Sequence, residues 1–333
     1  MKTITCENYE VIIGKNSIKS FNYTCYSKIA VLVDENTKKN CLEKFLQEVN
    51  FSKNYFIIEI SEGEQSKTIQ TCIYIWDKLV EYEFDKNSLF INLGGGLVSD
   101  IGGYCATNFK RGIDFINIPT TLLAMVDASI GGKLAVNYNN LKNQIGLFKN
   151  PIKVLINCCF LKTLTKQQVN SGYAEVIKHT LISNKDAWKN LKQNDLNNMN
   201  WETVIYNSIT IKNNIVLQDP YENNFRKILN FGHTYGHAIE SYYLDKNKPI
   251  LHGEAVMMGM ILEAEISKLT QQDKIDIKEY ILSNFELPYF PNKKKLAKYL
   301  KFDKKNKDMK VNFSLLKEIG HCEFDVLIKT NEL

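Results

Sequence analysis

Three of the five histidines lie within twenty residues of one another: His233, His237 and His252. His233 and His237 are four residues apart in NFGHTYGHAIE, so a helix there would place both imidazoles on one face. Glu175, in the earlier segment SGYAEVIKH, adds a carboxylate. Two imidazoles and one carboxylate are the ligand set of a catalytic zinc site, which keeps its fourth position open. Each histidine could instead be an ordinary core or surface residue, and the spacing leaves open whether His233 or His237 would ligate.

A glycine-rich turn is the second feature that could bind a ligand. The segment LGGGLVSD, residues 93–100, follows a run typical of a strand and opens a run typical of a helix. Glycines there let the backbone approach a pyrophosphate, and the helix start offers free N–H groups to an anion. The dinucleotide-binding fingerprint has glycine where Ser99 stands, which weakens that interpretation. A tight turn without a ligand is the alternative.

Other polar residues should lie at the same edge of the sheet. Thr120 and Thr121 follow the run DFINI, Glu64 and Lys67 follow YFIIEI, and Asp34 ends KIAVLVD. The carboxyl ends of parallel strands meet at one edge, where open α/β sheets bind their ligands. An acid at that position can accept a hydrogen bond from a ribose hydroxyl. Any one of these residues could belong to a solvated loop, but their shared placement favours a nucleotide site.

Several basic and amide side chains fall in apolar segments or beside glycines. A cation in apolar surroundings needs an anionic partner, which the phosphate and carboxylate of a substrate would supply. For Lys178 and Arg226 a solvated surface position is an equally good interpretation. The residues of this group are Lys133, Lys142, Asn143, Lys178, Lys212, Arg226 and Asn230.

The elements that must position these residues can be read from hydrophobic patterns. Short buried runs rich in β-branched residues predict strands at 28–34, 55–60, 88–93, 114–118 and 153–157. Helical spacing at 38–49 and 69–82 alternates with them, which predicts a parallel sheet covered on both faces. Beyond residue 160 the strands stop, and helical spacing follows at 165–181, 201–217, 226–243 and 253–269. We therefore expect an α/β N-terminal domain with a parallel, Rossmann-like sheet (residues 1–160) and an all-helical C-terminal domain (residues 161–333).

The amino-acid composition excludes several classes of protein. The chain has 333 residues, 44% hydrophobic and 24% charged, which excludes a disordered, collagen-like or coiled-coil chain. A formal net charge of +5 gives no case for nucleic acid and fits a site for small anions. The sequence has no apolar run long enough for a secretory signal or a membrane span. Eight cysteines without a CxxC pair predict reduced thiols, and hence a cytoplasmic protein.

Five ordered segments resemble those of one enzyme family. They are GGGLVSDIGGYCAT, KRGIDFINIPTTLLAMVDASIGGK, SGYAEVIKH, RKILNFGHTYGHAIE and HGEAVMMGM. Together they are similar, over roughly residues 30 to 315, to the 3-dehydroquinate synthase family of sugar phosphate cyclases. The resemblance implies conversion of 3-deoxy-D-arabino-heptulosonate 7-phosphate to 3-dehydroquinate and phosphate. It implies transient oxidation by NAD, β-elimination of phosphate, re-reduction and intramolecular aldol closure. It also implies a divalent metal, Zn²⁺ or Co²⁺, and a homodimer.

The resemblance also assigns roles to residues. The metal ligands would be Glu175, His233 and His252. The NAD positions would be Asp34, Glu64, Lys67, Gly95, Gly96, Asp100, Thr120, Thr121 and Lys142. The substrate positions would be Asp127, Lys133, Asn143, Lys178, Lys212, Arg226, Asn230, His237 and either Lys304 or Lys305, with Arg111 supplied by a neighbouring subunit. Of these, the catalytic residues would be His237, Lys178, Lys133, Arg226 and Asn230.

The chain departs from the family pattern at three places. Ser99 replaces a usual glycine, Leu134 replaces a usual threonine, and 139–141 replace a usual Pro-Leu-Gly. The alternatives are another sugar phosphate cyclase, a metal-dependent polyol dehydrogenase, or a degenerate copy without turnover. The carboxylate-binding set, with Arg226, Asn230 and the lysines of DKKN, favours the dehydroquinate reaction over another cyclase.

Overall fold

The computed structural model describes residues 1–333 except 50, 52–54, 140, 197, 301–309 and 330–333. The chain divides into two compact units. The first comprises Met1–Thr165 and Trp201–Asn213, and the second comprises Lys166–Asn200 and Asn214–Leu333. Helix α7 (Trp201–Gln218) therefore contributes residues to both. Lys304 and Lys305, two of the expected substrate residues, lie outside the described residues.

The first unit is built on a mostly parallel sheet with the strand order β1-β2-β9-β6-β5-β3-β4. Within the described residues every neighbouring pair is parallel apart from β1 and β2. The parallel strands predicted from the buried runs are confirmed as β3, β4, β5, β6 and β9. The strands are β1 (Lys2–Thr5), β2 (Glu10–Ile13), β3 (Ile29–Asp34), β4 (Tyr55–Ile60), β5 (Leu89–Gly94), β6 (Asp114–Pro119) and β9 (Lys153–Ile156).

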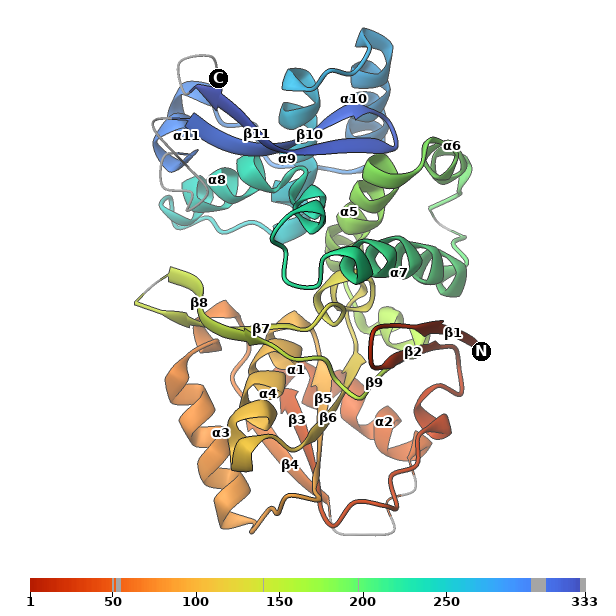
Figure 1. The fold of residues 1–333 in the computed structure, drawn as a ribbon, viewed down its shortest axis with the longest axis vertical. Helices are drawn as coiled ribbons and strands as arrows, with labels where there is room; N and C mark the ends of the chain where they lie inside the picture. The colour runs from red at the N-terminus through yellow and green to blue at the C-terminus, as the bar shows by residue number, and fades with distance from the viewer. Residues whose placement is uncertain (50, 52–54, 140, 197, 301–309, 330–333) are drawn as a thin grey trace. The chain divides into compact units, whose positions relative to one another are not determined.

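Helices cover both faces of this sheet, as the alternating pattern predicts. They are α1 (Glu35–Thr37), α2 (Glu43–Glu48), α3 (Ile69–Glu81) and α4 (Gly96–Asn108). Figure 1 shows α3 and α4 on one side of the sheet and α2 on the other. Phe90 and Phe115 of the strands share a buried cluster with Ile75 of α3 and Ile101 of α4. Apolar burial between these layers provides the main stabilisation of the unit.

A hairpin that the sequence patterns did not predict follows β6. It consists of the antiparallel strands β7 (Lys133–Tyr138) and β8 (Leu141–Phe148). Leu134, one of the departures from the family pattern, is buried in the cluster between sheet and helices. A Cβ added at Gly103 of α4 would lie 2.6 Å from a methyl carbon of Leu134. The leucine therefore fits because α4 has a glycine beside it.

The second unit is mainly helical, as the sequence predicts. Its helices are α5 (Lys166–Ser183), α6 (Lys185–Gln193), α8 (His233–Leu244), α9 (His252–Ile266), α10 (Gln271–Asn284) and α11 (Lys293–Leu300). Helix α9 packs against α5, α8 and α10. Among the described helices, none is both long enough and apolar enough to span a lipid bilayer.

Two details of this unit differ from the sequence prediction. The expected helix at 226–243 is interrupted: a short 3-10 turn (Phe225–Asn230) ends before α8, and Gly232 between them is left-handed with φ 82°. The unit is also not all-helical, because β10 (Lys310–Glu318) and β11 (His321–Lys329) form an antiparallel hairpin. β10 supplies Val311 and Phe313 to the core that it shares with α8 and α9.

Candidate active site

Three side chains of the second unit converge in the arrangement expected of metal ligands. Glu175 projects from α5, and His233 and His252 are the first residues of α8 and α9. Glu175 Oε1 lies 3.5 Å from His233 Nε2 and 3.6 Å from His252 Nε2. Ligand atoms at about 2.1 Å from a tetrahedral zinc ion are roughly 3.4 Å apart. The donor set and its spacing therefore fit a small divalent cation.

Close helix contacts bring these ligands together. A Cβ added at Gly253, next to His252, would lie 2.0 Å from the carbonyl oxygen of Ser171 on α5. The Gly253 N–H instead donates a 2.9 Å hydrogen bond to Ser171 Oγ. A Cβ at Gly259 would lie 1.9 Å from the carbonyl oxygen of Gly232, just before α8. The glycines of HGEAVMMGM thus let α9 approach both of the other ligand-bearing segments.

The electrostatic surroundings of the two histidines differ. Burial lowers the pKa of His233 well below its usual range, and the positive charge of Lys178 lowers it further. Partial burial alone would also lower the pKa of His252, but the carboxylates of Glu175 and Glu240 outweigh it and raise that pKa to about 10. Metal ligation requires neutral imidazoles. His233 therefore meets this requirement at neutral pH, whereas His252 would release a proton when it ligates.

Lys178 and His237 lie beside the three ligands, and Arg226 and Asn230 precede His233 in the sequence. Lys178, buried on α5, forms an ion pair with Glu175 one helical turn away. The His237 ring centroid lies 5.5 Å from that of His233 and 6.4 Å from that of His252. Arg226 and Asn230 occupy the short 3-10 turn that leads into α8. Imidazole and ammonium groups that close to a metal site can hold an anion and move protons.

One functional position of this segment escaped the sequence analysis. Asp219 follows α7 and accepts backbone hydrogen bonds from Asn223, Asn224 and Arg226 at 2.7–3.0 Å. Burial would raise the pKa of Asp219, but these N–H donors outweigh it and hold the pKa below its usual range. The carboxylate therefore fixes the loop that presents Arg226. The run DPYENN, rich in turn residues, is the signal that could have revealed it.

In the first unit, the glycine turn forms a cradle at the carboxyl end of β5. Gly95 precedes α4, whose first turn carries no acidic residue. A Cβ at Gly95 would lie 3.3 Å from the Thr121 side chain, and a Cβ at Gly96 would lie 3.1 Å from that of Ala128. Thr120, buried after β6, donates its N–H to the Gly94 carbonyl at 3.0 Å. Free N–H groups and missing side chains suit a pyrophosphate.

Two more of the expected nucleotide residues, Lys67 and Asp100, belong to a polar network at this edge. Lys67 Nζ donates to Asp100 Oδ2 at 2.6 Å and to Asn143 Oδ1 at 2.7 Å. Burial raises the pKa of Asp100 to about 6, and the charge of Lys67 offsets only part of that rise. Lys142 lies next to Asn143 on β8. The loop after β4 and the β7–β8 hairpin are therefore tied together by one lysine.

Asn137 on β7 is a second residue that the sequence analysis missed. Its Nδ2 donates to Glu64 Oε1 at 2.8 Å, and its Oδ1 accepts from the Asn143 backbone N–H at 2.9 Å. It joins an expected nucleotide residue to an expected substrate residue. No sequence signal marks it, because Glu64 is 73 residues away along the chain.

Asp34, expected to bind NAD, and Lys212, expected to bind substrate, both form hydrogen bonds with other residues of the first unit. Asp34 at the end of β3 accepts hydrogen bonds from the Thr37 backbone N–H at 2.7 Å and from the Thr37 hydroxyl at 2.9 Å, so it caps α1. Lys212 donates to the Asp127 carbonyl at 2.6 Å and to its carboxylate at 2.7 Å. Lys133 begins β7 directly after the left-handed Gly131 and Gly132.

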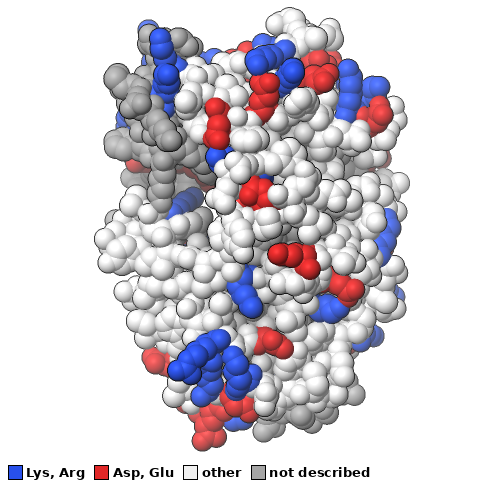
Figure 2. Space-filling view, in the orientation of Figure 1, with Lys and Arg blue, Asp and Glu red and all other residues white. Residues whose placement is uncertain are grey.

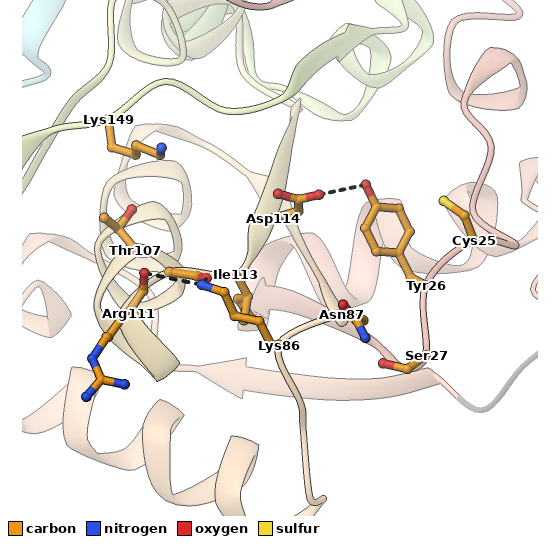
Figure 3. Close-up of a pocket in the computed structure, with 11 residues that line it drawn as sticks. Cys25, Tyr26, Ser27, Lys86, Asn87, Thr107, Arg111, Ile113, Asp114 and Lys149 are labelled. Carbon is orange, nitrogen blue, oxygen red and sulfur yellow. Dashed lines mark hydrogen bonds between the residues drawn. The ribbon is translucent and has the colours of Figure 1, made fainter.

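Arg111 lies at the opposite edge of the sheet. It follows the C-terminal end of α4 and precedes β6, whereas Thr120 follows β6. Arg111 lines a pocket of about 680 Å³ together with Lys86 and Lys149, and Figure 3 shows these basic side chains arriving from three different segments. The two edges of the sheet are separated by the length of a strand. Arg111 is therefore not part of the cradle at Gly95.

Solved structures of two cyclases share this fold. The 2-deoxy-scyllo-inosose synthase complexed with carbaglucose-6-phosphate, NAD⁺ and Co²⁺ has a TM-score of 0.88 and 23% identity, covering 99% of this chain and 97% of that one. The 2-epi-5-epi-valiolone synthase from Streptomyces hygroscopicus subsp. jinggangensis 5008, with NAD⁺ and Zn²⁺ bound, has a TM-score of 0.85 and 22% identity, covering 100% and 96%. The chain therefore shares the fold of these two synthases.

Two family models match consecutive parts of the chain. The model described as 3-dehydroquinate synthase N-terminal matches residues 57–171, and the one described as 3-dehydroquinate synthase C-terminal matches residues 172–306. The 3-dehydroquinate synthase of Parabacteroides distasonis is 39% identical over 304 residues, which cover 89% of this chain and 86% of that protein. The chain belongs to the 3-dehydroquinate synthase family.

Proposed function

We propose that this chain is a 3-dehydroquinate synthase. It converts 3-deoxy-D-arabino-heptulosonate 7-phosphate to 3-dehydroquinate and phosphate, with NAD and a divalent metal, Zn²⁺ or Co²⁺, as cofactors. The observation that carries the proposal is the convergence of Glu175, His233 and His252 in a chain matched along 57–306 by the models of this family. The same match favours this reaction over those of another cyclase or of a polyol dehydrogenase.

In this proposal each unit supplies one cofactor site. The first unit holds NAD at the Gly95 cradle, with Asp34, Glu64, Lys67, Asp100, Thr120, Thr121 and Lys142 around it. The second unit holds the metal on Glu175, His233 and His252. When bound, the metal would act as a Lewis acid on a substrate hydroxyl, and NAD would accept and return a hydride within one cycle.

The chain's own side chains bind and orient the substrate. Lys178, Arg226 and Asn230 in the second unit provide cationic and amide donors for the carboxylate and phosphate ends. The proposed substrate residues of the first unit are Asp127, Lys133, Asn143 and Lys212, and Lys304 or Lys305 lies outside the described residues. His237 stands one helical turn from His233, where it would take a proton from the substrate hydroxyl. Fixing the ring in one orientation holds it in place for the oxidation, the loss of phosphate and the re-reduction in turn.

Arg111 would act in the site of a second subunit. Its position at the amino edge of the sheet, opposite the Gly95 cradle, supports that role. In such a homodimer, Arg111 of each subunit would reach the active site of the other subunit. This arrangement would account for a basic pocket far from the cradle.

We place the enzyme in the cytoplasm, acting on a small molecule. All eight cysteines are free thiols, as a reducing compartment allows. On the face seen in Figure 2, basic and acidic side chains alternate in small groups, which is not the continuous basic surface that nucleic acids favour.

The decisive experiment follows phosphate release from the heptulosonate phosphate in the presence of NAD and Zn²⁺. We expect phosphate to appear without net NADH, because the hydride returns within the cycle. Accumulating NADH would instead indicate a polyol dehydrogenase. No release from this substrate, with turnover of a different sugar phosphate, would indicate another cyclase.

Two variants test the metal assignment. We expect Glu175→Gln and His252→Ala each to abolish turnover and to lose bound metal, because each removes one of three protein ligands. Glu279→Gln, on the exposed side of α10, is the matched control and should retain both. Metal content and phosphate release are the measurements, and full retention in both variants would contradict the assignment.

A further inference from the structure

Helices α8 and α9 begin in the same way. Each has a histidine of the candidate metal set as its first residue, His233 in α8 and His252 in α9. The first turn of a helix has unsatisfied N–H groups and opens more readily than the middle. Each ligand therefore stands where its own helix holds it least firmly. Contacts from other helices can therefore strengthen its position.

A carboxylate from α9 fixes the start of α8. Glu263, fully buried on α9, accepts the Gly232 N–H on Oε2 at 2.6 Å and the Tyr235 N–H on Oε1 at 2.9 Å. These two N–H groups flank His233 at the end of the helix where the macrodipole is positive. A buried carboxylate there acts as a helix cap supplied by a neighbouring helix. It also stabilises the left-handed turn at Gly232, which directs the chain into α8.

A carboxylate from α8 reaches the start of α9 in return. Glu240 lies seven residues after His233, on the same helix face. Its Oε1 is 3.5 Å from Nδ1 of His252, while Nε2 of His252 is 3.6 Å from Glu175 Oε1. The ring nitrogen next to Glu240 is therefore the one turned away from the other ligands. A carboxylate at that nitrogen fixes the tautomer and the orientation of a ligating imidazole.

We propose that Glu240 and Glu263 are a reciprocal pair of positioning residues for the metal site. Glu240, on the helix of His233, orients the imidazole of His252, and Glu263, on the helix of His252, anchors the backbone that carries His233. This inference rests on the proposed metal site. It adds that the two histidines are held as a coupled pair and not independently.

The chemistry of the two side chains supports a role beyond packing. Burying a carboxylate is unfavourable unless strong hydrogen bonds compensate. Glu263 uses both oxygens on two separate N–H groups, which a glutamine could not do with its single carbonyl oxygen. Glu240 faces an imidazole whose other nitrogen is directed to the ligand set. Each carboxylate therefore suits the groups that it contacts: two backbone N–H groups for Glu263 and an imidazole nitrogen for Glu240.

The experiment measures metal affinity without substrate. Each variant of the full-length chain is titrated with Co²⁺ in competition with a chromophoric chelator, and the visible absorption of bound Co²⁺ is recorded. We expect Glu240→Ala to bind Co²⁺ 10- to 100-fold more weakly with an altered spectrum, and Glu240→Gln to lose less because its carbonyl still accepts from Nδ1. Metal-free thermal unfolding should show that both variants are folded at the temperature of the titration.

Glu263→Gln should weaken Co²⁺ binding and also lower the metal-free midpoint, because it removes a buried cap. Glu265→Gln is the control, since this glutamate of α9 is exposed and pairs with Lys293 at 3.0 Å; it should change neither. If Glu263→Gln fails to fold, the Glu240 variants decide. Wild-type affinity and spectrum in Glu240→Ala would overturn the inference. Absence of Co²⁺ and Zn²⁺ binding by the unchanged chain would instead refute the proposed metal site.

Discussion

The hydroxyl of Ser99 is buried in α4 and has no hydrogen-bond partner among the residues that the structure describes. A buried hydroxyl without a partner costs about 1–3 kcal/mol. Serine at this position therefore lowers the stability of the helix that follows the glycine cradle. The family's usual glycine would avoid the unpaired hydroxyl, but it would loosen the helix.

We expect Ser99→Ala to raise the free energy of unfolding by about 1 kcal/mol, because alanine removes the unpaired hydroxyl and favours the helix. Ser99→Gly should raise the free energy of unfolding by less, since glycine destabilises a helix by about 1 kcal/mol relative to alanine. Denaturant unfolding of the NAD-free protein measures both. A stability loss in Ser99→Ala would mean that the hydroxyl has a favourable contact.

At the scale of elements, the approach of α9 to the turn before α8 depends on one glycine. A Cβ at Gly259 would lie 1.9 Å from the Gly232 carbonyl oxygen, whereas a Cβ at Gly236 would lie 3.3 Å from the Ala255 carbonyl oxygen. The first contact requires the helices to separate, and the second requires only a small adjustment. Both glycines lie between the same two helices, so they form a matched pair.

We expect Gly259→Ala to destabilise the protein by about 3 kcal/mol, the upper part of the usual overpacking range. Gly236→Ala should cost about 1 kcal/mol or less. Thermal unfolding and Zn²⁺ affinity are the measurements, and Zn²⁺ affinity should fall in Gly259→Ala because the separation moves His252 from His233. Equal effects of the two changes would contradict this packing argument.

The Asp219 loop gives a pH-dependent prediction. Because the folded state holds the pKa of Asp219 below its usual range, the carboxylate stabilises the fold above the unfolded pKa of about 3.9. That contribution is lost as pH falls through the lower folded-state pKa. We expect Asp219→Asn to cost about 1.5 kcal/mol at pH 7 and progressively less below about pH 4. Urea unfolding at several pH values checks this, and a constant difference down to pH 2 would contradict it.

At the scale of the whole molecule, a variant of Arg111 and a variant of a metal ligand should restore activity when they are combined in one dimer. If Arg111 acts across a dimer, a mixed dimer of Arg111→Ala and Glu175→Gln chains contains one intact site. Random reassociation of equal amounts would restore about one quarter of wild-type phosphate release, although each variant alone is inactive. Mixing after mild dissociation tests this. No recovery, with mixed dimers demonstrated, would mean that Arg111 serves its own subunit or none.

The fold was predictable where burial is continuous along the chain. The runs that became β3, β5 and β6 are buried along nearly their whole length, so composition alone marks them. The hairpin β10–β11 was missed because its register shifts between Phe313 and Leu315 and again between Leu316 and Glu318, which obscures the alternation. The break before α8 was missed because helical spacing continues through Gly232, and Glu263, which stabilises the turn, is thirty-one residues away in the sequence.

The residue types of the candidate site could be read from the sequence, but their contacts could not. Histidine spacing and a nearby carboxylate indicate a metal site without saying which atoms meet. Glu240 and Asn137 each contact a partner that the fold brings close, and no local pattern identifies them. Asp219 contacts residues that follow it closely in the sequence, so the turn-rich run DPYENN is the one signal for it. Lys178 and Arg226, which the sequence left equally open to solvent or interior, are both buried.

The placement of His233 and His252 at the two helix starts has a consequence for the protein's fluctuations. A bound ion would link the two helix starts directly, in addition to the contacts of Glu240 and Glu263, so both should open together and less often. Backbone deuterium uptake in the first turns of α8 and α9 should therefore slow together when Zn²⁺ is added, while uptake in α10 stays the same. Slowing in only one of the two turns would show that the ion does not join them.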